Sequence, residues 1–239
     1  MINIRGISKS FNGQLVLDRI DLDIVDGEIL VILGESGAGK SVLLQHLIGL
    51  FRPDQGRINI GGVDITKLPE RELLKIRKTM GYLFQQGALY DFMTVAENAA
   101  FPLREHTRLK SKDIKKKVDE VLKLVDLEKA SAKYPSELSG GMKKRAALAR
   151  AIIMDSKVIF CDEPTSGLDP IRSKDISDLI RNVSRQLKCT TVVASHDIPN
   201  SFRIADRIAL IRGGRIVALG TPRQLRDSED PFVQEFIKA

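Results

Sequence analysis

The sequence predicts an α/β protein with a parallel sheet, a small antiparallel β sublobe and an α-helical sublobe. Short apolar runs at 28–34 ("EILVILG"), 157–164 ("KVIFCDEP") and 190–197 ("TTVVASHD") each end in glycine or polar residues. Helical patterns separate these runs, as in a parallel sheet that is covered on both faces. The first thirty residues instead form short alternating β-like pieces around Gly13 and Gly27, as in an antiparallel lobe.

The remaining elements follow in chain order. "SVLLQHLIGLF" at 41–51 predicts a helix packed on several sides, and "GRINIGGVDI" at 56–65 predicts a further strand and turn. Residues from about 86 to 136 are mostly helical in pattern, and 171–187 predict the helix between the last two apolar runs. We expect one domain over 1–239, with a helical sublobe at about 86–145.

Composition excludes several classes of protein. The chain has 239 residues, of which 43% are hydrophobic, so disorder is improbable. No run reaches the roughly 20 apolar residues that cross a bilayer. The N-terminus has no signal-peptide pattern, which indicates the cytoplasm. Cys161 and Cys189 lie in apolar or β-branched surroundings without metal-ligand spacing, so we expect reduced core thiols.

The net charge of +7 permits nucleic acid, an anionic membrane surface or phosphate ligands as partners. The densest basic segment is 108–125, "RLKSKDIKKKVDEVLKLV". Its apolar residues recur at helical spacing, so we interpret the lysines as the solvated face of an amphipathic helix.

A glycine-rich segment follows the first apolar run, and "GESGAGKS" at 34–41 fits G-x-x-x-x-G-K-[ST]. Glycines let backbone N–H groups turn toward a β- and a γ-phosphate, Lys40 adds a positive charge, and the Ser41 hydroxyl can bind Mg²⁺. The helix start that follows adds its positive dipole end. We predict a P-loop NTPase core whose phosphate-binding residues are Gly34, Glu35, Ser36, Gly37, Ala38, Gly39, Lys40 and Ser41.

Polar residues at two other strand ends complete this chemistry. Asp162 ends an apolar run and is the expected second Mg²⁺ ligand, while Glu163 beside it is the expected general base for in-line attack by water. His196 ends the next run, where it would contact the γ-phosphate or hold the attacking water.

A second glycine-rich helix start lies in "LSGGMKKRAALARAI" at 138–152. Ser139, Gly140 and Gly141 would present backbone N–H groups and a hydroxyl to an anion, as the first start does. One nucleotide loop does not need a second start in the same chain. We therefore predict a head-to-tail homodimer in which this segment closes over ATP held by another copy.

Taken together, these motifs resemble the ATPases of the ATP-binding cassette (ABC) transporters. In that resemblance "GESGAGKS" is the Walker A loop, "LSGGM" the signature motif, "VIFCDEP" the Walker B motif, and "SGLD" at 166–169 the D-loop. The resemblance implies that Gln85 is a Q-loop residue linking Mg²⁺ and the γ-phosphate to a membrane partner, that Phe11 stacks on adenine, and that Asp169 belongs to the nucleotide site. Met142 and Phe11 depart from the commonest residues of the family, glutamine and tyrosine, and neither change removes a phosphate ligand.

The segment "FQQGALYDFMTVAENAAFPLREHT" at 84–107 is apolar and aromatic without a simple period. The family resemblance implies that a cytoplasmic helix of the transmembrane partner docks just after the Q-loop. We therefore expect Leu89, Tyr90, Phe92 and Met93 to be exposed at an interface. Internal packing of the helical sublobe is the alternative, and we expect both to be partly true.

The amino-acid sequences of segments 84–107 and 136–152 also resemble those of the ATPases of Mla phospholipid-transport systems. That resemblance implies a permease, an MCE-type lipid-binding protein, a small STAS-type subunit, and a peripheral position on the cytoplasmic face of the inner membrane. An ATPase for amino-acid, metal or lipoprotein transport is the nearest alternative.

Two readings outside transport stay open on the residues alone. One is a cassette ATPase acting on nucleic acid, ribosomes or iron–sulfur assembly, but the chain has no arginine-rich tail, and the segment after Gln85 is apolar, so we expect no nucleic-acid partner. The other is a regulatory subunit that binds ATP without cleaving it, which the presence of Glu163 and Ser139 argues against. The C-terminal "DSEDPFVQEFIKA" is expected to form a short amphipathic helix that docks on its own lobe or on a partner.

Overall fold

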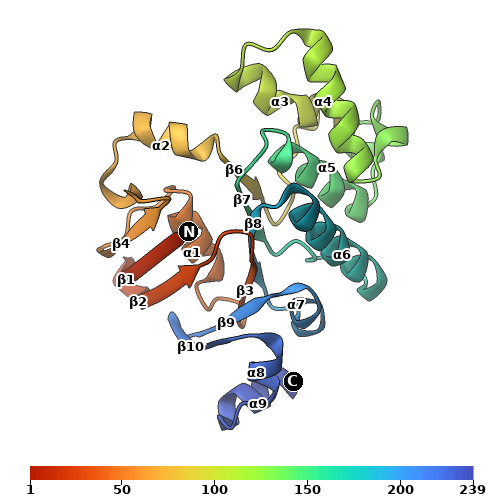
Figure 1. Cartoon of the computed structure of the whole chain (residues 1–239). Coiled ribbons are helices and arrows are strands. Elements are labelled where there is room, and N and C mark those ends of the chain that lie inside the picture. Colours follow the sequence, from red (N-terminus) through yellow and green to blue (C-terminus); the bar gives the residue numbers. More distant parts are fainter. Residues whose placement is uncertain (239) are drawn as a thin grey trace. The chain divides into compact units, whose positions relative to one another are not determined.

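The computed structural model describes residues 1–238, which fall into two compact units. The first unit combines residues 1–74 with 190–238, and the second spans Lys75–Cys189 (Figure 1). Each unit has its own strands and helices, and each is described separately below.

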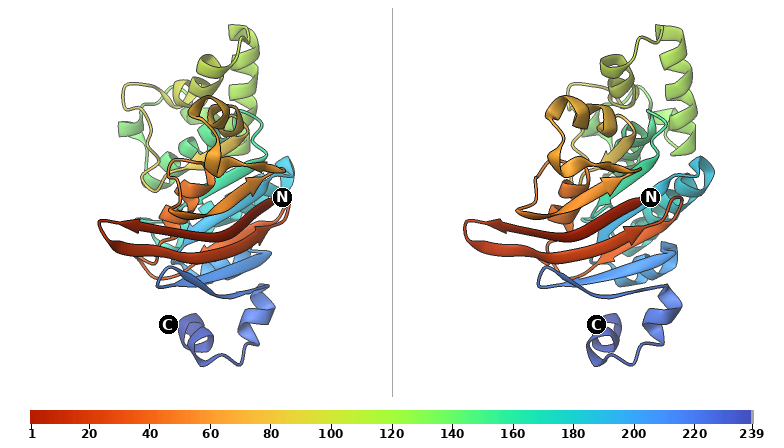
Figure 2. Two further views of the ribbon diagram at one scale, coloured as in Figure 1. Left: turned by 90° about the vertical axis from the view of Figure 1, so that its left-hand side faces the viewer. Right: turned by 60° about the vertical axis from the view of Figure 1, so that its left-hand side comes forward.

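The first unit contains an antiparallel sheet of strands in the order β2-β1-β4-β5. These strands are β1 (Ile2–Phe11), β2 (Gln14–Ile24), β4 (Gln55–Ile60) and β5 (Val63–Asp64). Between β1 and β2 the two-residue loop Asn12-Gly13 has φ values of 50° and 80°. Positive φ at both central residues is the geometry of the tight hairpin turn that Asn-Gly favours. Figure 2 shows the long hairpin that results.

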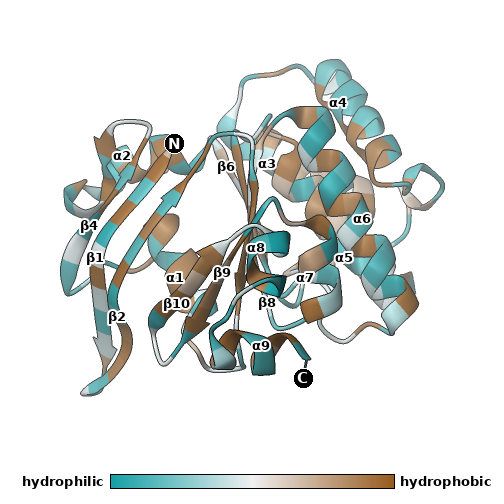
Figure 3. Cartoon of the chain, turned by 60° about the horizontal axis from the view of Figure 1, so that its bottom comes forward, coloured by the Kyte–Doolittle hydropathy of each residue, from teal (hydrophilic) through white to brown (hydrophobic). Residues whose placement is uncertain are grey.

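Parallel strands form the buried part of the first unit. β3 (Ile29–Leu33) lies between β8 (Thr190–Ser195) and β9 (Arg207–Arg212), parallel to both, and β10 (Arg215–Gly220) pairs antiparallel with β9. Every residue of β3 and β8 is buried, and β9 is drawn mainly in the hydrophobic colour in Figure 3. The helices are α1 (Lys40–Leu47), α7 (Ile198–Ile204), α8 (Pro222–Arg226) and α9 (Pro231–Lys238).

The second unit places helices around a parallel pair of strands, β6 (Met80–Leu83) and β7 (Val158–Asp162). Its helices are α3 (Val95–His106), α4 (Ser111–Leu124), α5 (Gly140–Ile152) and α6 (Pro170–Leu187). α2 (Glu70–Arg77) precedes β6 and begins in the first unit, which also contains the 3₁₀ turn Ile65–Lys67, while the 3₁₀ turns Glu128–Ala130 and Pro135–Glu137 belong to the second unit. The parallel strands, the antiparallel sheet and the helical segment predicted from the sequence are thus confirmed.

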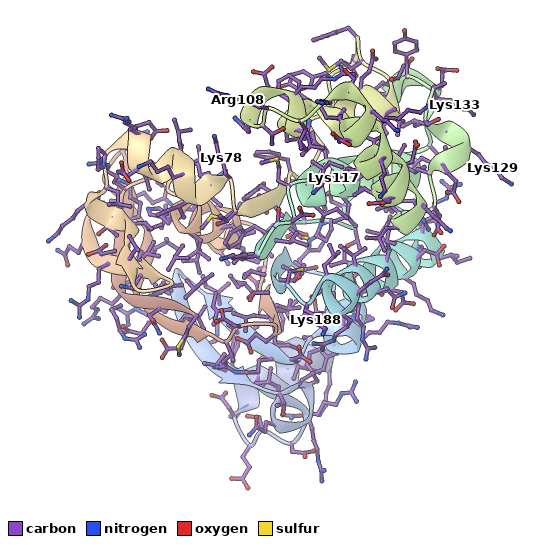
Figure 4. All side chains as sticks on the ribbon, turned by 45° about the horizontal axis from the view of Figure 1, so that its top comes forward. Lys78, Arg108, Lys117, Lys129, Lys133 and Lys188 are labelled. Atoms are coloured by element: carbon purple, nitrogen blue, oxygen red, sulfur yellow. The ribbon has the colours of Figure 1, made fainter. Side chains whose placement is uncertain are left out.

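The lysine-rich segment forms the amphipathic helix that its spacing predicts. α4 buries Val118 and Leu122, and its lysines are exposed except for Lys117, which is half-buried and pairs with Asp155. Figure 4 labels six basic side chains of the second unit, of which Lys78, Arg108, Lys129, Lys133 and Lys188 are exposed. Cys161 and Cys189 are free and buried, as predicted.

The C-terminal segment forms the short helix α9, which packs within the first unit. Val233 is buried, and the Arg212 guanidinium lies 4.1 Å from the centre of the Phe232 ring. Of the two positions expected for this segment, the structure shows docking on its own lobe. Among residues 1–238, no helix combines the length and hydropathy that a membrane span requires.

Candidate nucleotide-binding site

The loop at 34–39 joins β3 to α1, as its motif requires. Gly37 and Gly39 have φ values of 82° and 99°, which side chains rarely adopt. At Gly34 a Cβ would lie 2.4 Å from the carbonyl oxygen of Ile211, so only glycine fits there. Each glycine therefore has a backbone or steric reason in the structure itself.

Lys40 is the first residue of α1, and its ammonium folds back onto the loop. The side chain is buried, and Nζ donates to the carbonyl oxygens of Gly34 at 2.8 Å and Glu35 at 2.9 Å. Gly39 is the N-cap of α1 and contributes no side-chain hydrogen bond to the helix start. A helix start beside a buried cation makes this turn suitable for a phosphate group.

Two other predicted residues lie in the first unit. Phe11 ends β1, and its half-buried ring packs edge-on against Phe51 at 5.3 Å between centroids, with Lys9 Nζ 5.4 Å from the Phe11 ring centre. His196 follows the last residue of β8 and is exposed. Both residues lie at strand ends, and for His196 this is the position that the sequence predicts.

A shallow hollow of about 190 Å³ lies beside the phosphate loop within the first unit. Its lining includes Glu35, Ser36, Arg212, Phe232 and Phe236. The C-terminal helix α9 therefore borders the outer side of the loop.

In the second unit, Asp162 and Glu163 occupy the end of β7. Asp162 is buried, and its Oδ2 accepts a hydrogen bond from the Tyr82 hydroxyl at 3.2 Å. Burial, together with the nearby Asp162 charge, raises the pKa of Tyr82 well above its usual value, so the phenol stays a proton donor. Tyr82 thus holds one oxygen of the predicted metal ligand in place.

Glu163 has an unusual backbone conformation. Its φ is 46°, in the left-handed region that residues with a side chain seldom adopt, and it is 7% exposed. Such strain persists only where surrounding contacts enforce it, and it is concentrated at functional sites. The conformation therefore supports the role predicted for Glu163.

A buried cation contacts the backbone of Glu163. Lys144, in α5, donates from Nζ to the carbonyl oxygen of Glu163 at 3.3 Å, to the hydroxyl of Ser166 at 3.3 Å, and to the carbonyl oxygen of Gln85. Burial lowers the pKa of Lys144, while the Glu163 and Asp162 charges oppose this effect. Gln85 itself is exposed.

The second glycine-rich helix start is confirmed as the beginning of α5. Ser139 is its N-cap, and the Ser139 hydroxyl accepts from the backbone N–H of Met142 at 3.4 Å. Ser139 and Gly140 are exposed, and a Cβ at Gly140 would lie 3.2 Å from a methyl carbon of Leu168. The hydroxyl hydrogen remains available to an incoming anion, because the cap uses only the oxygen as acceptor.

Asp169 has a structural task in addition to the one predicted for it. It caps α6, and its Oδ1 accepts from the N–H groups of Ile171 at 3.1 Å and Arg172 at 3.0 Å. These bonds and the Arg172 charge lower the pKa of Asp169. The side chain therefore holds the end of the D-loop.

The structure divides the predicted residues between the two units. The first unit holds Phe11, the phosphate loop and His196, and the second holds Gln85, Ser139, Gly140, Gly141, Asp162, Glu163 and Asp169. Sequence reasoning missed Tyr82 and Lys144. A helical period does put Lys144 on the same face as Ala147, Leu148 and Ala151, which was the available signal.

The donor chemistry fits magnesium. Ser41 in the first unit has a hydroxyl oxygen, and Gln85 and Asp162 in the second unit have amide and carboxylate oxygens. Oxygen is the ligand type that Mg²⁺ prefers, and Mg²⁺ usually keeps several waters. Within residues 1–238, no group of three or more His, Cys, Asp or Glu side chains could hold a metal ion. When bound, Mg²⁺ would neutralise charge on the phosphate oxygens.

Comparison with known proteins identifies the family. The family model described as "ABC transporter" matches residues 17–166. A probable ribonucleotide transport ATP-binding protein of Mycobacterium leprae is 43% identical over 99% of this chain, which spans 68% of that relative. The MlaF ATP-binding protein of the intermembrane phospholipid transport system of Haemophilus influenzae is 42% identical over 100% of this chain and 90% of its own length.

A solved structure shows the same fold. It is a dimeric ATP-binding cassette in a post-hydrolysis state with ADP and Pi bound, with a TM-score of 0.86 and 31% identity. The match covers 93% of this chain and 99% of that one. The chain therefore belongs to the ABC transporter family and is an ATP-hydrolysing, ATP-binding subunit of that family.

Proposed function

We propose that this ATPase powers phospholipid transport through a separate membrane permease. Its similarity to MlaF extends over the whole chain. Overall identity alone does not choose the cargo, because a methionine import protein of Clostridium tetani is 44% identical and a probable sulfate/thiosulfate import protein of Chlorella vulgaris is 41% identical. The proposal depends on the segment at 84–107, which would meet the permease.

The observation that carries the proposal is the ordered, outward-facing aromatic surface in this segment. Buried Asn98 accepts from the N–H of Tyr90 at 2.8 Å and donates to the carbonyl oxygens of Tyr90, Met93 and Thr94. These bonds hold the loop so that Phe92 is 74% exposed and Tyr90 37% exposed. A rigid exposed aromatic pair is typical of an interface rather than of a core.

Two of the four residues expected at this surface are less exposed than predicted. Leu89 and Met93 are half-buried and not exposed. The Tyr90 ring also packs on Phe101 at 4.8 Å between centroids. Part of the segment therefore serves internal packing, and the surface we assign to the permease is centred on Phe92 and Tyr90.

For the chemical step, we propose that Lys40 and the loop N–H groups bind the phosphates of ATP, and that Glu163 takes a proton from the attacking water. His196 holds that water or the γ-phosphate, and Phe11 stacks on adenine. Ser41, Gln85 and Asp162 would hold Mg²⁺. The signature residues Ser139, Gly140 and Gly141, with Asp169 of the D-loop, complete the site from a second copy of the chain.

We further propose that the homodimer is peripheral, on the cytoplasmic face of the inner membrane. Its other partners would be an MCE-type lipid-binding protein and a small STAS-type subunit, and the chain would act as one cassette domain over 1–239. No nucleic acid enters this scheme, since the exposed surface after Gln85 is aromatic.

Affinity purification tests the proposal. The tagged chain is recovered from detergent-solubilised membranes of its source, and its companions and lipids are identified by mass spectrometry. We compare Phe92→Ser with Leu187→Ser, because Leu187 is an exposed apolar residue of the same unit at 40% exposure. We expect a polytopic permease, an MCE-domain protein and phospholipid with the parent chain and with Leu187→Ser, and loss of all three with Phe92→Ser.

Other outcomes would reject the lipid cargo, the permease surface or the role of Phe92. Recovery of an amino-acid or sulfate permease would keep the transporter and reject the lipid cargo. Recovery of soluble proteins or nucleic acid alone would reject the permease surface. Equal recovery with both variants would show that Phe92 is not part of the contact.

A further inference from the structure

The ammonium of Lys144 joins two loops of the second unit, the one after β6 and the one between β7 and α6. It donates to the backbone of Gln85 in the Q-loop, to the backbone of Glu163 after β7, and to the side chain of Ser166 in the D-loop. An ammonium has three N–H donors, so these three acceptors use its capacity completely. The side chain is 7% exposed, although α5 also carries the exposed Lys143 next to it.

The contact with Glu163 coincides with backbone strain. The Glu163 carbonyl oxygen accepts from Lys144 Nζ at 3.3 Å and from the Ser166 N–H at 3.1 Å. Glu163 has a φ of 46°, and a left-handed conformation of this kind needs outside contacts to persist. Lys144 supplies one such contact and holds the backbone from which the carboxylate extends.

The same helix provides a second, similar contact. Arg150 donates from Nη1 to the carbonyl oxygen of Ala88 at 2.6 Å and from Nη2 to that of Gly87 at 2.8 Å. Ala88 is also left-handed, with a φ of 48°. α5 thus uses two cations to hold the chain just after β6, and Lys144 alone also reaches the end of β7.

We propose that Lys144 is a positioning residue that links the Q-loop backbone to the backbone of Glu163, so that the two loops adopt their active positions together. A displacement of Gln85 by a membrane partner would then be transmitted to the general base through one side chain. The inference rests on the proposed role of Glu163. It assigns Lys144 no contact with ATP or with the reacting water.

Steady-state kinetics on the full-length chain tests the link. Lys144→Met keeps an unbranched side chain but removes every donor, and we expect kcat to fall roughly 10- to 100-fold while the KM for ATP stays within about threefold. Lys144→Arg restores donors and is expected to recover kcat to within about fivefold of the parent. Lys143→Met, an exposed lysine of the same helix, is the matched control and should stay within about twofold.

A second variant covers the case in which Lys144→Met does not fold, because that change leaves buried carbonyl oxygens without a donor. Lys144→Gln retains two N–H donors and should give a kcat between those of the parent and Lys144→Met. Thermal unfolding and binding of a fluorescent ATP analogue are measured on every variant. A merely structural role would lower stability and ATP binding together with kcat, and that result would overturn the inference.

Glu163→Gln in the same assay separates this inference from the proposed function. If Glu163→Gln hydrolyses ATP at the parent rate, Glu163 is not the general base. Lys144 would then have no base to position, and both the proposed role of Glu163 and the inference would fail. If Glu163→Gln is inactive while folded Lys144→Met keeps the parent kcat, the proposed function stands and the inference alone fails.

Discussion

The two glycine-rich helix starts of this chain differ in how they meet an anion. α1 begins at Lys40 after a left-handed Gly39, has no side-chain cap, and has its own buried ammonium at the loop. α5 begins after Ser139, an extended residue whose hydroxyl caps the helix, and its Ser139 and Gly140 are exposed. The buried ammonium of α5, on Lys144, contacts carbonyl oxygens and Ser166 instead.

This difference indicates a division of work. A start with an enclosed cation and no side-chain cap can hold a polyphosphate by itself. A start with a neutral, exposed cap has weaker attraction for an anion, and it suits a ligand that another element already holds. The contrast agrees with the two roles proposed for these helix starts, and it predicts that changes at α1 affect ATP binding while changes at α5 affect turnover.

The largest expected effect comes from Glu163→Gln. A general base contributes typically 10²–10⁴-fold, so kcat should fall by about that factor while ATP affinity is kept. If both helix starts act on one nucleotide, the variant should also accumulate as a dimer in excess ATP, which size-exclusion chromatography with light scattering measures. Glu120→Gln, on the exposed side of α4, is the control, and unchanged hydrolysis in Glu163→Gln would remove the base assignment.

The next effect tests α1 directly. Lys40→Met removes the buried ammonium from the loop, and charged hydrogen bonds are worth about 1.5–3 kcal/mol each, so the Kd for ATP should rise roughly 10- to 100-fold. Equilibrium binding of a fluorescent ATP analogue to the chain measures this change. Lys67→Met, an exposed lysine of the same unit, should bind like the parent. If Lys40→Met binds ATP with the same Kd as the parent chain, the backbone N–H groups of the loop are enough to bind ATP.

The third effect tests α5. Ser139→Ala should lower kcat roughly tenfold, the value of one or two lost hydrogen bonds, with ATP affinity unchanged within about threefold. Loss of the cap should also cost about 1 kcal/mol of unfolding free energy. Thr221→Ala removes the N-cap of α8, so it should show the same stability loss without the loss of turnover. A parallel fall in ATP affinity for Ser139→Ala would contradict the division between binding and turnover.

Local sequence patterns predict much of this arrangement. The strand before the phosphate loop, the two acidic residues at the end of β7 and the histidine after β8 each lie where an apolar run ends, and the structure agrees. Asp169 before Pro170 also has the residue types of a helix start, and Asp169 is the N-cap of α6. These signals are short-range, so they need no knowledge of tertiary packing.

Contacts between distant residues could not be predicted in the same way. The Lys144 contacts join residues up to 59 positions apart, and the Tyr82–Asp162 hydrogen bond joins residues 80 apart. The exposure of Leu89 and Met93 was overestimated, because both side chains are partly covered in the folded unit, which a local pattern does not show. Periodicity shows which face a side chain occupies, but only the fold shows what that face meets.

The smallest expected effect concerns the metal ligand of the second unit. Tyr82→Phe keeps the ring that packs near Phe84 and Phe160 but removes the hydrogen bond to Asp162. One neutral donor to a carboxylate at 3.2 Å contributes about 1 kcal/mol, so the Mg²⁺ concentration for half-maximal turnover should rise roughly three- to tenfold.

The Mg²⁺ titration at saturating ATP distinguishes two accounts of Tyr82. Because burial keeps the phenol protonated, its hydroxyl can orient Asp162 over the whole working pH range, and the shift should be the same at each pH. Tyr134→Phe, at an exposed tyrosine of the same unit, should leave the titration unchanged. A lower kcat in Tyr82→Phe with the same Mg²⁺ requirement would mean that the hydroxyl acts on the neighbouring Glu163 rather than on the metal ligand. That outcome would place the strand β6, and not only α5, among the elements that position the base.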